Sequence, residues 1–149
     1  MEAKIDEAVS FLESSHEGAL ATLEEGGPYV SAVCFLYDSP KASQSRFGRI
    51  YLFLSGLARH TKNIRKNPKA SLLAAGGGPE PNYVKKRVTA QGEIRPVNDP
   101  ARRKNFQERY IKIFPSSGQF FTLPDFCWFE MDISELHFIA GFGKIETFK

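Results

Sequence analysis

Apolar and polar residues alternate along most of the chain, which is the pattern of β-strands with one buried face. The alternation predicts strands at 19–24, 29–37, 49–55, 69–75 and 83–97, followed by two closing strands in "DFCWFEMDI" and "ELHFIAGFG". A turn near Ser134 is expected to join the last two strands, and polar stretches at 25–28 and 38–48 read as turns or loops. Strands therefore dominate the predicted structure.

Apolar residues recur at helical spacing in three places. The first is residues 3–15, and the second is a helix of about two turns that follows the strand at 49–55 and ends at Asn67-Pro68. The third begins at Asp99-Pro100, a side-chain cap followed by proline at the first helical position, and ends at Phe114-Pro115. Six or so antiparallel strands with these helices indicate one mainly β domain (α+β) over 1–149, closed into a small barrel.

Composition narrows the classes of protein. The chain has 149 residues, 42% of them hydrophobic, which suits a single domain with its own core. No apolar run approaches the roughly 20 residues that span a bilayer, and the amphipathic, acidic start lacks the features of a signal peptide, so we expect a cytoplasmic protein without membrane contact. Two cysteines do not predict a disulfide framework, and a net charge of +3 is too small for a polycation built to bind nucleic acid.

The strands at 29–37 and 49–55 are apolar on both faces. The interior of a barrel uses one face of a strand, and the predicted helices are too short to cover all of the other. A second copy of the chain is the simplest cover, so the pattern predicts a homodimer.

The segment "LFLSGLARHTKNIRKNPKASLLA" (52–74) carries candidate chemistry. The start of a helix offers unpaired backbone N–H groups and a partial positive charge, which suit a phosphate. Ser55 and Thr61 add hydroxyl donors, and Arg59 and His60 add charge-assisted ones. The alternative is a solvated connection, and we interpret the three remaining cations as an exposed helix face: Lys62, Arg65 and Lys66.

Five pieces of the sequence resemble the flavin-binding split-barrel proteins, the superfamily of pyridoxamine 5′-phosphate oxidase. They are "ALATL", "GGPYVSAVCF", "GRIYLFLSGLARHTKNIRKNPKASLL", "RVTAQGEIRPV" and "FIAGFG", and they extend from about residue 18 to residue 143. The chain is most similar to the haem-utilisation branch, without the C-terminal extension that its members often carry. The resemblance implies a six-stranded antiparallel Greek-key split β-barrel and flavin mononucleotide (FMN) bound at a homodimer interface.

The resemblance also implies cofactor contacts at nine positions. These are Ser31, Ala32, Val33, Ser55, Leu57, Arg59, His60, Thr61 and Arg87. Residues 31–33 match the segment beside the isoalloxazine ring, and Ser55 and Leu57 match positions along the ribityl chain and phosphate. His60 and Thr61 replace an Arg-Lys pair of the oxidase, with Arg59 as a neighbouring cation.

The implied function is a flavin-dependent oxidoreductase that acts on a small molecule. The residues with which the oxidase holds its substrate's phosphate have no clear counterparts, and no residue stands out as a catalytic acid or base. A non-catalytic flavin- or haem-binding protein, serving storage, sensing or haem utilisation, is the alternative. An anion or nucleic-acid binder that uses the basic segment without flavin is a third option. The histidines lack the spacing of metal ligands, so we expect no metal site.

Overall fold

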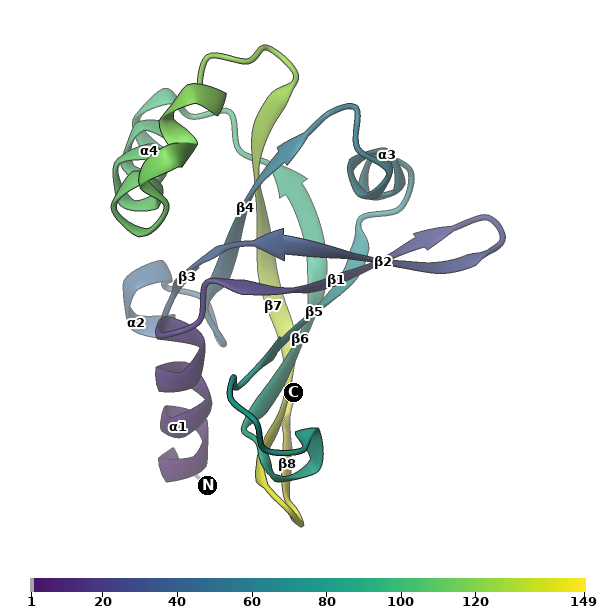
Figure 1. The fold of residues 1–149 in the computed structure, drawn as a ribbon, viewed down its shortest axis with the longest axis vertical. Helices are drawn as coiled ribbons and strands as arrows, with labels where there is room; N and C mark the ends of the chain where they lie inside the picture. The colour runs from purple at the N-terminus through teal and green to yellow at the C-terminus, as the bar shows by residue number, and fades with distance from the viewer. Residues whose placement is uncertain (1) are drawn as a thin grey trace.

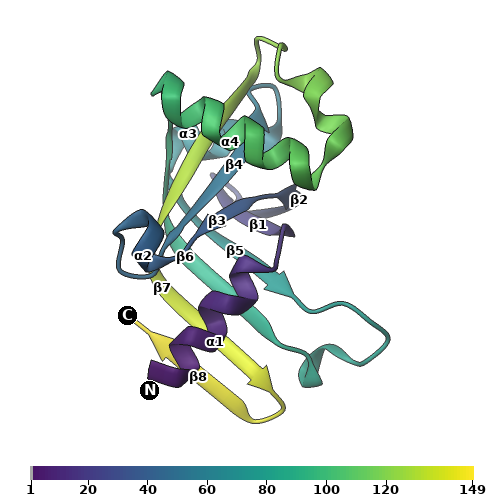
Figure 2. The same cartoon turned by 90° about the vertical axis from the view of Figure 1, so that its left-hand side faces the viewer.

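The computed structural model describes residues 2–149, and its strands form one antiparallel sheet that curls into a barrel (Figures 1 and 2). The strands are β1 (Glu17–Glu24), β2 (Gly27–Cys34), β3 (Leu36–Asp38), β4 (Arg49–Ser55), β5 (Lys69–Ala75), β6 (Arg87–Pro96), β7 (Phe126–Gly141) and β8 (Lys144–Phe148). The helices are α1 (Glu2–Glu13), α2 (Pro40–Ser43), α3 (Arg59–Lys66) and α4 (Pro100–Ile113), with 3₁₀ turns η1 (Asn82–Val84) and η2 (Pro115–Phe120). The predicted fold class, mainly antiparallel β with short helices, is confirmed.

The barrel is closed by the continuous segment β2–Phe35–β3, because β2 and β3 are the two ends of the strand order. The order is β2-β1-β5-β6-β7-β4-β3, and β8 pairs with β7. Because β2 and β3 are separated only by Phe35, the first and last strands of the order are neighbours in the chain. The Phe35 N–H donates to the carbonyl of His16 at 2.8 Å, and its side chain is fully buried in the core. The single strand predicted at 29–37 is therefore wrong: it is two strands with different partners.

The end of the chain also differs from the sequence prediction. The turn expected near Ser134 is absent from the described residues, because β7 runs unbroken from Phe126 to Gly141. The pairing of β6 with β7 shifts between Gln91 and Gly92, so Ser134 is the extra residue of a β-bulge, and its Oγ donates to the carbonyl of Gln91 at 3.1 Å. A Cβ at Gly92 would collide with the carbonyl of Asp132, which explains a glycine at this position. The strands number eight: the two predicted closing strands are the single strand β7, the strand predicted at 29–37 is β2 and β3, and β8 was not predicted.

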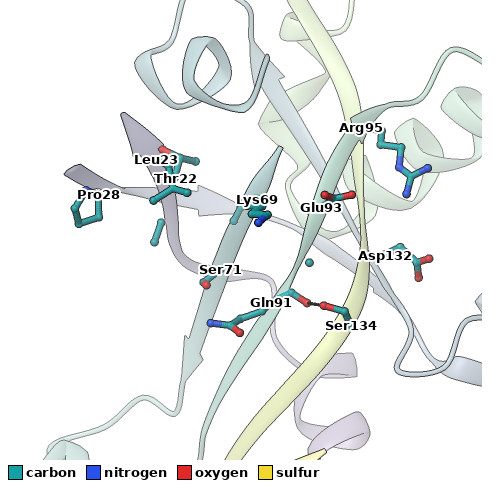
Figure 3. A pocket seen from close by; sticks show the side chains of 13 residues that line it. Thr22, Leu23, Pro28, Lys69, Ser71, Gln91, Glu93, Arg95, Asp132 and Ser134 are labelled. Carbon is teal, nitrogen blue, oxygen red and sulfur yellow. Dashed lines mark hydrogen bonds between the residues drawn. The ribbon is translucent and has the colours of Figure 1, made fainter. Parts of the chain in front are cut away.

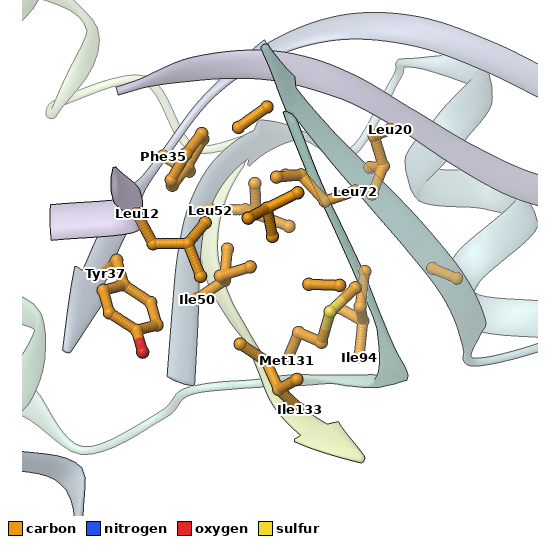
Figure 4. Packing of buried hydrophobic residues seen from close by; sticks show 14 of the residues in the cluster. Leu12, Leu20, Phe35, Tyr37, Ile50, Leu52, Leu72, Ile94, Met131 and Ile133 are labelled. Atoms are coloured by element: carbon orange, nitrogen blue, oxygen red, sulfur yellow. The ribbon is translucent and has the colours of Figure 1, made fainter. Parts of the chain in front are cut away.

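Hydrophobic side chains fill the barrel (Figure 4). Every second side chain of β4 is buried in the barrel core, namely Ile50, Leu52 and Leu54, and Leu72 of β5 lies in the same core. Helix α1 packs at one end of the barrel, where Leu12 is fully buried in the same core. Within residues 2–149, no helix is long and apolar enough to cross a membrane.

Helix α4 builds a second, smaller core on the outer face of β4 and β7. Tyr51 of β4 stacks on Phe106 of α4 at 4.2 Å between ring centroids, and Trp128 of β7 lies 5.2 Å from Phe106. The second apolar face of the strand at 49–55 is thus covered by the chain itself, which corrects the expectation that it needs a partner. The outer face of β2 is different, since Val30 is 62% exposed.

Candidate functional site

The N-terminus of helix α3 is not capped by a side chain of the described residues. Its N-cap residue is Ala58, whose methyl group accepts no hydrogen bond. The first backbone hydrogen bond of the helix runs from Lys62 N–H to the carbonyl of Ala58 at 3.2 Å. The N–H groups of residues 59–61 therefore have no acceptor within the helix, which makes this end a seat for an anion.

Two buried polar atoms of the first turn of α3 lack hydrogen-bond partners within residues 2–149. They are Nε2 of His60 and Oγ1 of Thr61, and the Thr61 side chain is fully buried. The other ring nitrogen of His60, Nδ1, lies 3.0 Å from Oγ of Ser31, so α3 and β2 meet here. Burial lowers the pKa of His60, which favours its neutral form. Each atom lacks a hydrogen-bonding oxygen, which the described residues do not supply.

The turn before α3 is bound to the segment that precedes β7. Oγ of Ser55 donates to Oδ2 of Asp125 at 2.7 Å and accepts from the N–H of Leu57 at 3.1 Å. The N–H of Gly56 donates to the carbonyl of Asp125 at 2.5 Å, and a Cβ on Gly56 would stand 3.1 Å from that oxygen. The predicted hydroxyl donor Ser55 is thus already used by Asp125, a residue that the sequence interpretation missed.

Arg65 extends from the last turn of α3 back toward this turn. Its Nη1 lies 3.5 Å from the position that a Cβ on Gly56 would occupy. The sequence interpretation placed Arg65 on an exposed helix face, and the residue is indeed exposed. Its guanidinium nevertheless adds a positive charge beside the start of the helix.

The predicted cation Arg59 is engaged by a carboxylate. Its Nε and Nη2 donate to the two carboxylate oxygens of Glu24, at 2.5 and 2.7 Å, and its guanidinium lies 4.2 Å from the ring centroid of Tyr29. Nδ2 of Asn63, one helical turn after Arg59, donates to Glu24 at 3.3 Å and to Oγ1 of Thr22 at 3.0 Å. The hydrogen bonds from Arg59 lower the pKa of Glu24, and the same pair raises the pKa of Arg59.

Eight of the nine predicted contact residues lie on β2 or around the start of α3. Five lie around the start of α3: Ser31, Ser55, Arg59, His60 and Thr61. Leu57 belongs to the same turn, with its side chain 74% exposed. Val33 is on the same face of β2 as Ser31, but it is buried in the barrel core. Ala32 projects to the opposite face of β2 from Ser31, as strand alternation requires.

Arg87 lies away from this group. It is the first residue of β6, and β6 is separated from β2 by β1 and β5. Its Nε is buried and has no hydrogen-bond partner in the described part of the chain. One copy of the chain therefore does not bring Arg87 to the start of α3.

A large hollow of the described chain lies elsewhere. It has a volume of about 730 Å³ and lies on the outer face of the sheet, where β1, β5, β6 and β7 contribute its walls (Figure 3). Lys69, Gln91, Glu93 and Asp132 are among the side chains around it, and none of the nine predicted contact residues lines it. Its lining carries charges of both signs, from Lys69 and Arg95 and from Glu93 and Asp132. Residues 2–149 also contain no cluster of three or more potential metal ligands.

Sequence comparison identifies the family. The model of the family described as pyridoxamine 5′-phosphate oxidase matches residues 5–140, which is most of the chain. The resemblance drawn from the sequence is thereby confirmed. No curated protein matches the sequence.

Solved structures share the fold across nearly the whole chain. A heme binding protein from Mycobacterium smegmatis matches with a TM-score of 0.82 and 20% identity, over 97% of this chain and 57% of that protein. HutZ, the heme storage protein from Vibrio cholerae, matches with a TM-score of 0.63 and 23% identity, over 93% of this chain and 95% of HutZ. An FAD-binding protein from Mesorhizobium loti matches with a TM-score of 0.65 and 18% identity, over 87% and 89%. At these identities the likeness concerns the fold.

Proposed function

Because the chain belongs to the pyridoxamine 5′-phosphate oxidase family, we propose that it binds FMN and acts as a flavin-dependent oxidoreductase on a small molecule. The observation that carries the proposal is the start of α3. An uncapped helix end, the buried Oγ1 of Thr61 and the buried Nε2 of His60 lie together without partners among the described residues. Buried polar groups are normally hydrogen-bonded, so their lack of partners here points to a polar ligand.

The residues present suit the parts of FMN. The N–H groups at the start of α3, the hydroxyl of Thr61 and the imidazole of His60 would hold the phosphate, with Arg65 adding charge. Asp125 accepts a hydrogen bond from Ser55 and has a second carboxylate oxygen for a hydroxyl of the ribityl chain. The ring would lie along residues 31–33 of β2. When bound, the flavin supplies the redox chemistry, and the protein supplies binding and orientation.

The unit of function in this proposal is a homodimer. The outer face of β2, β1 and β5 carries Val30, 62% exposed, and Leu73, 41% exposed, with small side chains between them. A second copy would cover this apolar face, and it would explain how Arg87, distant from α3 in its own chain, reaches a flavin site. Light scattering is expected to return twice the chain mass of 16.7 kDa. A monomer that binds FMN fully would contradict the dimer.

A second candidate is a flavin- or haem-binding protein without turnover. It is favoured by the shared fold with the heme binding protein of Mycobacterium smegmatis and with HutZ. The chain spans only 57% of the Mycobacterium protein. In this alternative the same barrel stores or senses a cofactor, and no electron acceptor is reduced.

Spectroscopy and titration separate these candidates. The purified protein is titrated with FMN, FAD, riboflavin and haem, and binding is followed by absorbance and by flavin fluorescence. We expect FMN to bind more tightly than FAD and riboflavin, because the α3 start is a seat for one phosphate. Oxidation of reduced nicotinamide with added acceptors then distinguishes an enzyme from a carrier. Binding of haem but not FMN would reject the first candidate in favour of the second.

A further inference from the structure

The carboxylate of Glu24 forms an ion pair with Arg59, the cation that would otherwise be free to bind the phosphate. Both oxygens of Glu24 accept from Arg59, through Nε and Nη2. This is the edge with which a guanidinium binds a phosphate in the bidentate geometry. A carboxylate and a phosphate therefore compete for the same donors.

The surroundings hold Glu24 and Arg59 together. Asn63 also donates to Glu24, and because it follows Arg59 by one helical turn, the two side chains project from the same side of α3. The ring of Tyr29 packs against the guanidinium with the centroid 4.2 Å away. Arg59 is consequently directed toward the β1–β2 hairpin, which Figure 1 shows extending beside α3.

We propose that Glu24 limits the affinity of the α3 site for phosphate by occupying Arg59, so that this one carboxylate determines how strongly the site prefers a phosphorylated ligand. The inference rests on the proposed function, since it assumes that FMN places its phosphate at the start of α3. A phosphate that takes Arg59 must displace Glu24, whereas a ligand without phosphate leaves the pair intact. The opposite role is an orienting one, in which Glu24 holds Arg59 ready for the ligand.

The two roles predict opposite effects of Glu24→Gln. The amide keeps the length of the side chain and its contact with Asn63, but it releases the charge of Arg59. Competition predicts that the affinity for FMN rises by about tenfold, the lower end of what a charge-assisted hydrogen bond contributes, because the pair is exposed. Riboflavin, which lacks the phosphate, is expected to bind as it does to the wild type.

Glu25→Gln is the matched control. Glu25 is the next residue, is exposed, and makes no hydrogen bond or ion pair within the described residues. Its substitution removes the same charge from the adjacent residue. If Glu25→Gln raises FMN affinity as much as Glu24→Gln does, general electrostatics account for the gain and the proposal is overturned.

Arg59→Ala completes a double-mutant cycle. In the wild type this substitution is expected to change FMN affinity little, because Glu24 already occupies Arg59. In the Glu24→Gln background it is expected to abolish the tenfold gain. Circular dichroism verifies that each variant is folded before titration.

The outcomes separate this proposal from the proposed function. Unchanged or weaker FMN binding by Glu24→Gln, with a wild type that binds FMN, overturns the role of Glu24 and leaves the flavin site standing. A wild type that binds FMN weakly and a Glu24→Gln variant that binds it tightly support both. If neither protein binds FMN, both proposals are wrong.

Discussion

Thr61→Val is expected to stabilise the fold and to weaken the binding of FMN. Thr61 is fully buried, and its Oγ1 has no hydrogen-bond partner within residues 2–149. A buried polar group without a partner costs about 1–3 kcal/mol. Valine has the same shape without the hydroxyl, so the free energy of unfolding of the ligand-free protein should rise by about 1 kcal/mol, or about 2–4 °C in Tm for a chain of this size.

The same substitution removes a donor to the phosphate. A hydrogen bond to a charged group contributes about 1.5–3 kcal/mol, so the dissociation constant for FMN should rise by about 10- to 100-fold. Riboflavin should bind to the variant and to the wild type alike. Urea unfolding measures the first effect, and fluorescence titration measures the second.

Thr22→Val is the control for the stability effect. Thr22 is also buried, at 1% exposure, but its Oγ1 accepts from Asn63 at 3.0 Å and lies 3.4 Å from the carbonyl of Tyr29, to which it donates. Its loss leaves Asn63 with a buried unpaired N–H, and we expect a destabilisation of about 1–2 kcal/mol. If Thr61→Val destabilises the fold as Thr22→Val does, the Thr61 hydroxyl has a partner and the reasoning about the site is refuted.

Three further predictions concern the acid sensitivity of the site, the core under α4 and the β-bulge. Burial lowers the pKa of His60 below its ordinary value of 6.5, so the unfolded chain takes up a proton more readily than the folded one, and the free energy of unfolding falls as the pH drops through that region. His60→Gln should reduce this loss of stability, measured by urea unfolding at about pH 5 and about pH 7. Trp128→Ala should cost about 3–5 kcal/mol by circular dichroism, because the ring packs on Phe53 and Phe106, and a loss below about 1 kcal/mol would contradict that core. Gly92→Ala should lower Tm, since its Cβ would collide with the carbonyl of Asp132, and an unchanged Tm would show that the bulge yields.

The sequence predicts the strands that do not change partners along their length. The strands expected at 49–55 and 69–75 have the same bounds as β4 and β5. Helices α3 and α4 also lie where their signals place them, because proline and capping residues act locally. Changes of partner are not local. The apolar run through Phe35 does not reveal that the chain leaves β1 and pairs with β4, and Ser134 looks like a turn although β7 continues through a bulge.

Sequence analysis finds the basic and hydroxyl residues of the candidate site, but it does not find the two carboxylates beside them. Residues 55–61 are close together in the chain, and the phosphate chemistry of a helix start identifies them. Glu24 and Asp125 come from distant elements, and a search for phosphate donors does not look for carboxylates. The spacing of Arg59 and Asn63 places two donors on one side of α3, but the sequence does not show that they share an acceptor or that it is Glu24.

Amide chemical shifts of the ¹⁵N-labelled protein during FMN titration show whether the phosphate binds at the start of α3. They report the binding position residue by residue and do not depend on any activity. We expect the proposed site to give the largest changes at the N–H groups of residues 57–61, where the phosphate would lie, together with changes at residues 31–33 along the ring. Riboflavin should reproduce the changes at 31–33 and lack those at 59–61. Changes centred on Gln91 and Glu93 in the outer hollow, or none at the start of α3, would contradict the proposed site.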